Sequence, residues 1–210
     1  INKQFRIASD VDPEHPDSDY ARRICGLGAL FTLTAPGIPL LFMGNEMLEN
    51  GDFHDDHCLD WGKQRKNAGL VKLNRDLIRL RRDMDQAGDA LKGKGYSTAF
   101  QNREQGLLVY WRWHQDNPAD KMVGAVNLSA QPREQVTVAV PAVGTWIQRI
   151  NTDADVYDGK TRSAIGKRFD VAGQDRSFTL DLAPYSASIF SLADRPAAAT
   201  SAGSSTVAAS

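Results

Sequence analysis

Thr34-Ala-Pro-Gly-Ile-Pro-Leu-Leu-Phe-Met-Gly-Asn-Glu46 holds a short apolar run, Ile38 to Met43, between turn-forming residues. Pro36 and Pro39 punctuate the start of this run, and Gly44 ends it. An apolar run of this length between turn-forming residues is typical of a β-strand that is buried on both faces. We therefore predict a buried strand at residues 38–43.

Helical patterns lie on both sides of this strand, at about residues 17–33 and 68–84. A helix, a buried strand, a polar loop and a second helix form one repeat of a parallel α/β fold. A single parallel strand needs hydrogen-bonded neighbours and helices over both faces. Because the chain contains no second repeat, we expect the N-terminal part of this domain to be missing.

The first helix is predicted from apolar residues at spacings of four, three and four, namely Tyr20, Ile24, Leu27 and Phe31. Asp17, Ser18 and Asp19 precede it as N-cap candidates. Cys25 is expected to be a buried thiol on this helix. Residues 1–16 are polar and are interpreted as a loop.

The bulk composition excludes several classes of protein. The 210 residues are 41% hydrophobic and 24% charged, which is ordinary for a globular protein. A net charge of -1 gives no reason to expect a nucleic-acid partner or an anionic membrane surface. No run reaches the ~18 apolar residues of a membrane span. The two cysteines form no disulfide framework.

The second half has the pattern of an antiparallel β-sandwich, with alternation and regular spacing of short apolar segments. The predicted strands are Tyr96–Gln101, Leu107–His114, Met122–Leu128, Glu134–Val140, Thr145–Ile150, Ser163–Val171, Ser177–Leu182 and Ala187–Leu192. The glycine-rich residues 88–95 mark a domain boundary. We predict an α/β part at 1–90, an all-β domain at 91–194, and a disordered tail at 195–210 that is rich in Ala and Ser.

The polar loop at residues 47–61 is a candidate functional segment because loops of this length in compact domains are usually functional or disordered. It contains His54-Asp-Asp-His57-Cys58, which has residue types that zinc accepts, and calcium through Asp52 and its neighbours is a further possibility. The spacing matches no metal motif. We favour a polar rim loop, and we expect no metal and no cofactor.

Four segments carry a resemblance to the α-amylase superfamily of glycoside hydrolases, and they match best in its α-glucan branching enzymes and related bacterial amylases. They are Tyr20-Ala-Arg-Arg, Leu33 to Glu46, Leu59-Asp-Trp61 and Leu73 to Arg82. Downstream, Val126-Asn-Leu-Ser129 and Ala183-Pro-Tyr-Ser-Ala187 resemble the all-β domain that follows the barrel in these enzymes. The resemblance covers residues 1 to about 193.

The resemblance implies a fold and a mechanism. Residues 38–43 would be the eighth strand of a (β/α)₈ barrel, followed by a C-terminal antiparallel β-sandwich domain. The superfamily uses a retaining mechanism with an aspartate nucleophile and a glutamate acid/base, about 5 Å apart. Both carboxylates, and a further aspartate, would precede Ile1. No catalytic residue is therefore expected in this chain.

The resemblance also assigns candidate substrate-binding residues, namely Gly44, Asn45, Glu46 and Trp61. Active sites form at the C-terminal ends of barrel strands, which is where Glu46 would lie. Glu46 would contact sugar, or it would pair with an arginine or cap loop amides. Gly44 would let the backbone turn. Trp61 would stack on a sugar ring, or it would anchor the loop to the barrel, and we favour the anchor.

Other polar and aromatic residues have structural interpretations. Trp111 and Trp113 share one strand face, and we favour sandwich core over an exposed glucan platform. The cluster Arg79, Arg81 and Arg82 is interpreted as a solvated helix face. Asn127 and Ser129 are expected to serve a turn.

We expect the parent protein to be a 1,4-α-glucan branching enzyme that binds glycogen, starch or maltooligosaccharide through its full barrel. The alternatives are an amylase-type hydrolase or a trehalose-metabolising relative, and, in another class, a stand-alone carbohydrate-binding β module. The chain alone is expected to be inactive. A cytoplasmic location is expected, although the true N-terminus is expected to be absent.

Overall fold

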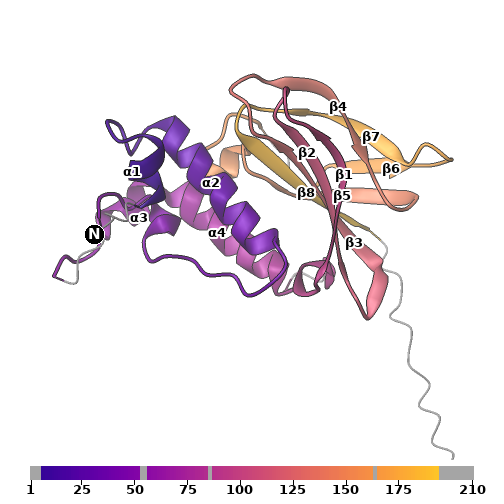
Figure 1. The fold of residues 1–210 in the computed structure, drawn as a ribbon, viewed down its shortest axis with the longest axis horizontal. Helices are drawn as coiled ribbons and strands as arrows, with labels where there is room; N and C mark the ends of the chain where they lie inside the picture. Colours follow the sequence, from indigo (N-terminus) through magenta and orange to yellow (C-terminus); the bar gives the residue numbers. More distant parts are fainter. Residues whose placement is uncertain (1–5, 53–55, 85–86, 163–164, 194–210) are drawn as a thin grey trace, which may run out of the picture.

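The computed structural model describes residues 6–52, 56–84, 87–162 and 165–193. Its helices lie on one side of a six-stranded sheet, and a two-stranded sheet covers the other side (Figure 1). The predicted tail lies outside the described residues. No helix in the described part is long and apolar enough to cross a membrane.

The helical part is built mainly from two packed helices. The α-helices are α1 (Ile7–Val11), α2 (Asp19–Thr34), α3 (Gly62–Lys66) and α4 (Ala68–Arg81), and the 3₁₀ turns are η1 (Asn45–Met47), η2 (Ala90–Lys92) and η3 (Asp155–Tyr157). Ser18 is the N-cap of α2 and accepts a hydrogen bond from the amide of Ala21 at 3.1 Å, as the sequence predicted. The prediction of a loop over residues 1–16 was wrong at α1, where Ala8 is buried against the helical core.

The predicted buried strand at residues 38–43 does not form. The segment has no strand assignment, and the side chains of Ile38 and Leu40 are 98% and 87% exposed. A strand requires backbone partners, and no described strand lies beside this one. The segment is instead positioned at its start by Arg81, which donates hydrogen bonds to the carbonyls of Leu33 at 2.8 Å and Ala35 at 3.0 Å. The interpretation of Arg81 as a solvated side chain was therefore wrong.

The described residues of the all-β half form eight strands. They are β1 (Gly95–Asn102), β2 (Leu107–His114), β3 (Asn117–Asn127), β4 (Arg133–Ala139), β5 (Gly144–Asn151), β6 (Arg168–Val171), β7 (Ser177–Leu182) and β8 (Ser186–Leu192). The large sheet has the order β1-β2-β3-β8-β5-β6, and the small sheet pairs β4 with β7. All strand pairs are antiparallel, which confirms the predicted class of this half.

The strand positions follow the sequence prediction closely, and β2 and β7 have the predicted bounds. The strand predicted to start at Met122 begins earlier, at Asn117. The one predicted from residue 163 begins only at Arg168, and residues 163–164 lie outside the described part. The antiparallel all-β half is therefore readable from alternation alone.

The six-stranded sheet has a hydrophobic core on each face. On one face, Leu30 of α2 and Leu77 of α4 are fully buried in a cluster that includes Tyr110 and Ile189 of the sheet. On the other face, Trp146 is fully buried in a cluster with residues of β4 and β7. Cys25 lies in the helical cluster, as predicted, and burial raises the pKa of its thiol to about 12.

Polar contacts also join the helices to the β half of the chain. The hydroxyl groups of Thr34 in α2 and Tyr110 in β2 are 2.7 Å apart and buried. The Tyr157 hydroxyl donates to Asp76 of α4 at 2.9 Å. Because a common hydrophobic core and these hydrogen bonds join the two halves, α2 and α4 pack directly against the β-strands.

The glycine-rich junction at residues 88–95 is held by two buried charged residues of the β half. Arg112 of β2, 1% exposed, donates to the carbonyls of Gly95 at 3.0 Å and Gly93 at 2.7 Å. Asp120 of β3 accepts from the amide of Asp89 at 2.7 Å. The division of the chain into domains at this point stays a prediction.

Candidate functional site

The turn after the 38–43 segment is formed by Gly44. Its φ is 89°, which lies in the left-handed region, and a Cβ atom there would come within 2.6 Å of the Cβ of Glu49. Glycine is the residue that meets both conditions. The amides of Met47 and Glu49 donate to the Gly44 carbonyl at 3.1 and 2.9 Å. The structure thus agrees with the role predicted for Gly44 as a turn.

Asn45 and Glu46 follow in η1, and both are half-buried. Within the described part of the chain, the Glu46 carboxylate makes no hydrogen bond or ion pair. The predicted alternative in which Glu46 pairs with an arginine or caps amides is therefore not what the structure shows. Glu46 lines a largely apolar groove of about 650 Å³ between the 38–43 segment and α4, beside Met43 and Arg75.

Glu49 organises the loop that follows, a role that no local sequence pattern indicates. Its carboxylate is buried, lies 2.5 Å from Lys63 Nζ, and accepts the amides of Asp60 at 2.8 Å and Asn50 at 3.2 Å. Burial acts to raise the pKa of the Glu49 carboxyl, but the Lys63 ammonium and the two amides outweigh it, so the pKa lies below its ordinary value. Glu49 therefore joins the start of the loop to its end.

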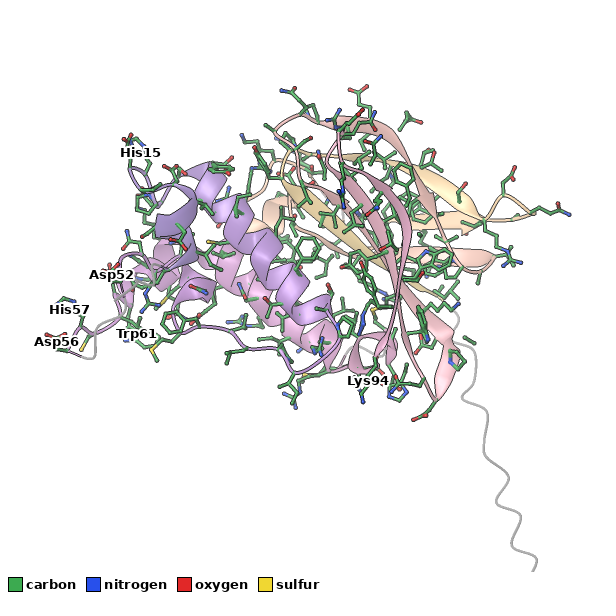
Figure 2. All side chains as sticks on the ribbon, viewed as in Figure 1. His15, Asp52, Asp56, His57, Trp61 and Lys94 are labelled. Carbon is green, nitrogen blue, oxygen red and sulfur yellow. The ribbon has the colours of Figure 1, made fainter. Side chains whose placement is uncertain are left out.

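Trp61 lies at the N-cap position of α3 and is 65% exposed. Figure 2 shows it, with Asp52, Asp56 and His57, at the end of the helical part that is far from the strands. Most of the Trp61 ring is exposed to solvent in this structure, and the preferred interpretation, that Trp61 anchors its loop to the barrel, stays a prediction. An exposed indole remains available for stacking on a ligand.

The loop with metal-ligand residue types shows no metal centre in the part that is described. Asp56, His57 and Cys58 are exposed, and no group of three or more His, Cys, Asp or Glu residues among the described residues is arranged to hold an ion. Phe53, His54 and Asp55 lie outside the described residues. The polar rim loop that was favoured stays a prediction.

Trp111 and Trp113 are half-buried on the inner side of the sandwich. Trp111 packs against the inner core, and its Nε1 donates to the carbonyl of Ala139 across the two sheets at 2.9 Å. Lys121 lies beside both rings, 5.8 and 5.6 Å from their centroids. For Trp111 the core interpretation is confirmed, so the pair is not an open platform.

Asn127 and Ser129 serve a turn, as predicted. Asn127 Nδ2 donates to the carbonyls of Gln131 at 2.8 Å and Ala183 at 2.9 Å. The amide and hydroxyl of Ser129 donate to Asn127 Oδ1 at 2.9 and 2.7 Å. These bonds join the end of β3 to the segment between β7 and β8.

The residues around Gly44 offer binding groups. Glu46 supplies a carboxylate that no described residue uses, and Trp61 supplies an exposed aromatic ring. Glu49 is already held by Lys63 and two amides. A carboxylate and an exposed aromatic ring can bind a ligand that has both hydroxyl groups and an apolar face. Retaining cleavage of a glycosidic bond needs more, namely a pair of carboxylates about 5 Å apart.

Comparison with protein families matches residues 98–193 to the family described as the alpha amylase C-terminal all-beta domain. These residues run from within β1 to the end of the described part. The match therefore covers the β half and does not include the helical half.

The curated relatives include 1,4-alpha-glucan branching enzymes named GlgB. The one from Roseobacter denitrificans is 30% identical over an alignment of 170 residues, and the match covers 76% of this chain and 23% of the relative. The one from Pseudomonas syringae pv. tomato is 31% identical over an alignment of 172 residues, and the match covers 76% of this chain and 22% of the relative. The chain thus spans under a quarter of the length of these relatives.

Among solved structures, the chain is similar to an alpha-amylase from Geobacillus thermoleovorans that was crystallised with acarbose. The TM-score is 0.60 at 17% sequence identity, and the match covers 83% of this chain and 34% of that one. At this identity the match shows a shared fold. It extends beyond the β half into the helices.

Proposed function

Because this chain is similar to the C-terminal part of α-amylase superfamily enzymes, and carries their C-terminal all-β domain, we propose that it is the C-terminal part of a 1,4-α-glucan branching enzyme. The observation that carries this proposal is the similarity to branching enzymes over 76% of the chain, which includes helical residues as well as strands. In such an enzyme an α-1,4 link is cleaved and its glycosyl part is transferred to a sugar hydroxyl.

The exposed segment at residues 38–43 supports a barrel in the complete enzyme. Ile38 and Leu40 present unpaired backbone and almost fully exposed side chains, and apolar grooves of about 550 and 650 Å³ flank the segment. Monomeric proteins rarely leave such surface uncovered. We assign the segment as the eighth strand of a (β/α)₈ barrel, with α2 before it and α4 after it.

Gly44, Asn45, Glu46 and Trp61 are assigned to substrate binding in this enzyme. The C-terminal end of a barrel strand is where a barrel builds its active site. Glu46 is free to accept hydrogen bonds from sugar hydroxyls, and Trp61 is exposed enough to stack on a pyranose ring. The catalytic carboxylates are assigned to residues outside this chain, so the chain alone is expected to be inactive.

The proposal is tested with the protein encoded by the complete reading frame that contains this chain. Incubation with amylose should reduce iodine staining without creating reducing ends, because transfer conserves the number of reducing ends, whereas hydrolysis would increase it. Loss of staining with new reducing ends would favour a hydrolase instead. Unchanged amylose would contradict both, and the 210-residue chain alone serves as the inactive control. A cytoplasmic location stays a prediction, which cell fractionation would test.

A further inference from the structure

A groove of about 720 Å³ lies on the open side of the β-sandwich, away from the residues around Gly44. Its walls are β1, the edge strand of the large sheet, and β4, with Gln105 in the turn after β1. Its volume lies in the range of about 300–1,000 Å³ that is usual for ligand sites. Its lining combines apolar side chains such as Leu107 and Val136 with polar ones such as Gln105 and Arg133.

A β-bulge places an aromatic ring in this groove. The pairing of β1 with β2 shifts between Thr98 and Phe100, so Thr98 pairs with Tyr110 whereas Phe100 pairs with Val109. Directly paired residues share a face of the sheet. Tyr110 faces the helices, and Val109 faces the inner side of the sandwich. The bulge therefore turns Phe100 toward the inner side, where it is nevertheless 43% exposed.

The opposite wall is also bulged. The pairing of β4 with β7 shifts between Arg133 and Val136, and Gln135 within the bulge has a φ of 51°. A left-handed backbone is unfavourable for a non-glycine residue and is found preferentially at active sites and ligand sites. The amide of Gln135 is held by Asp181 at 2.8 Å, so the bulge has a defined geometry.

Arg133 carries a buried polar atom in this wall that lacks a partner among the described residues. It is half-buried and pairs with Leu182 of the inner core, and its Nε is buried without a hydrogen bond to any described residue. A buried donor without an acceptor is unfavourable, and because Arg133 lines the groove, its guanidinium can donate to a ligand that supplies an acceptor there. The negative charge of Glu134, which also lines the groove, offsets the positive charge of Arg133. This favours a neutral ligand over an anion.

We propose that the groove between β1 and β4 binds a linear α-1,4-glucan chain, as an accessory site separate from the barrel. The glucan packs the apolar face of a glucosyl ring on Phe100, and its hydroxyls accept from Arg133 and bond with the carboxamide of Gln105. The identity of this ligand rests on the proposed function. A β-strand of another protein is a poorer occupant, because bulges in both edge strands obstruct strand addition.

The site is tested by titrating the ¹⁵N-labelled 210-residue chain with maltoheptaose and following the backbone amide signals. We expect shifts concentrated in residues 99–107 and 132–137. Phe100→Ala should weaken Kd by roughly tenfold or more, as for an aromatic anchor at a binding site. Phe100→Trp should retain binding, and Arg133→Ala should weaken it. Each variant is checked by its thermal unfolding.

The matched control is Tyr96→Ala. Tyr96 is an exposed aromatic on the same strand, but it pairs with Arg112 and so lies on the helix-facing side of the sheet. It should leave maltoheptaose binding unchanged. Shifts that map elsewhere, or a Kd that is insensitive to both Phe100→Ala and Arg133→Ala, would overturn the proposal. Formation of α-1,6 links by the complete enzyme is measured separately, so either claim can fail without the other.

Discussion

The guanidinium of Arg23 in α2 lies 2.7 Å from the carboxylate of Asp153, which follows β5 and is only 2% exposed at its side chain. Arg23 also donates to the carbonyl of Pro184 at 3.1 Å, and Asp153 accepts from the hydroxyl of Thr161 at 2.6 Å. This pair joins the helical half to the β half through a buried charge contact. It adds to the shared core and the hydrogen bonds that hold α2 on the strands.

Replacing Arg23 by methionine should therefore destabilise the protein by about 3–5 kcal/mol, the usual cost of leaving one member of a buried pair without its partner. Urea unfolding followed by circular dichroism measures the loss. The control is Lys66→Met, because the Lys66–Asp17 pair is 64% and 60% exposed at its side chains and should contribute nothing measurable. Equal effects of the two substitutions would contradict this role of Arg23.

The lowered pKa of Glu49 should make the stability of the fold depend on pH. Its pKa is lower in the folded protein than in the unfolded chain, so the folded protein is stabilised above the unfolded value of about 4.3. That contribution is lost as the pH falls through the lower folded value. Glu49→Gln should therefore reduce the free energy of unfolding at pH 7 and change it much less at pH 3. A difference that stays constant between these pH values would contradict the charge contact with Lys63.

Gly44→Ala should destabilise the turn after residues 38–43, by about 1–3 kcal/mol for the backbone conformation and more for the contact with Glu49. Gly51→Ala is the matched control, because Gly51 has a φ of 77° but, apart from its chain neighbours, no described residue has an atom within 4 Å of an added Cβ. Thermal unfolding should show a larger loss for Gly44→Ala. A larger loss for Gly51→Ala would mean that the close approach of Glu49 is unimportant.

The two cysteines should differ in reactivity. Cys25 is buried and its pKa is raised to about 12, so little thiolate is present at pH 8, whereas Cys58 is exposed. Iodoacetamide should label Cys58 in the folded protein and Cys25 only after denaturation. Peptide mass spectrometry after timed labelling measures both rates. Equal rates in the native protein would show that α2 is not packed as described.

The sequence predicted those elements that depend on local patterns. Alternation located β2 and β7, and helical periodicity with the N-cap Ser18 located α2. The short helix α1 was missed because only Ala8 of its five residues is buried, which leaves no periodic signal. The strand expected at residues 38–43 failed because a strand also requires partners, which a local apolar run does not show.

Features that depend on distant residues were out of reach. Arg23 and Asp153 are far apart in sequence, and nothing near either residue indicates the other. The bulge that turns Phe100 toward the groove depends on the register with β2, which is set by pairing rather than by the residues of β1. Among the candidate site residues, the role of Gly44 was predictable, since a glycine after an apolar run indicates a turn. The contacts of Glu49 were not.

The most direct test of the central claim is a count of α-1,6 links in amylose after incubation with the complete protein that contains this chain. Proton NMR resolves the anomeric signals of α-1,4 and α-1,6 links. The account predicts that α-1,6 signals appear and increase with time while the number of reducing ends stays constant. Amylose that shortens with no α-1,6 signal would contradict the assignment to a branching enzyme.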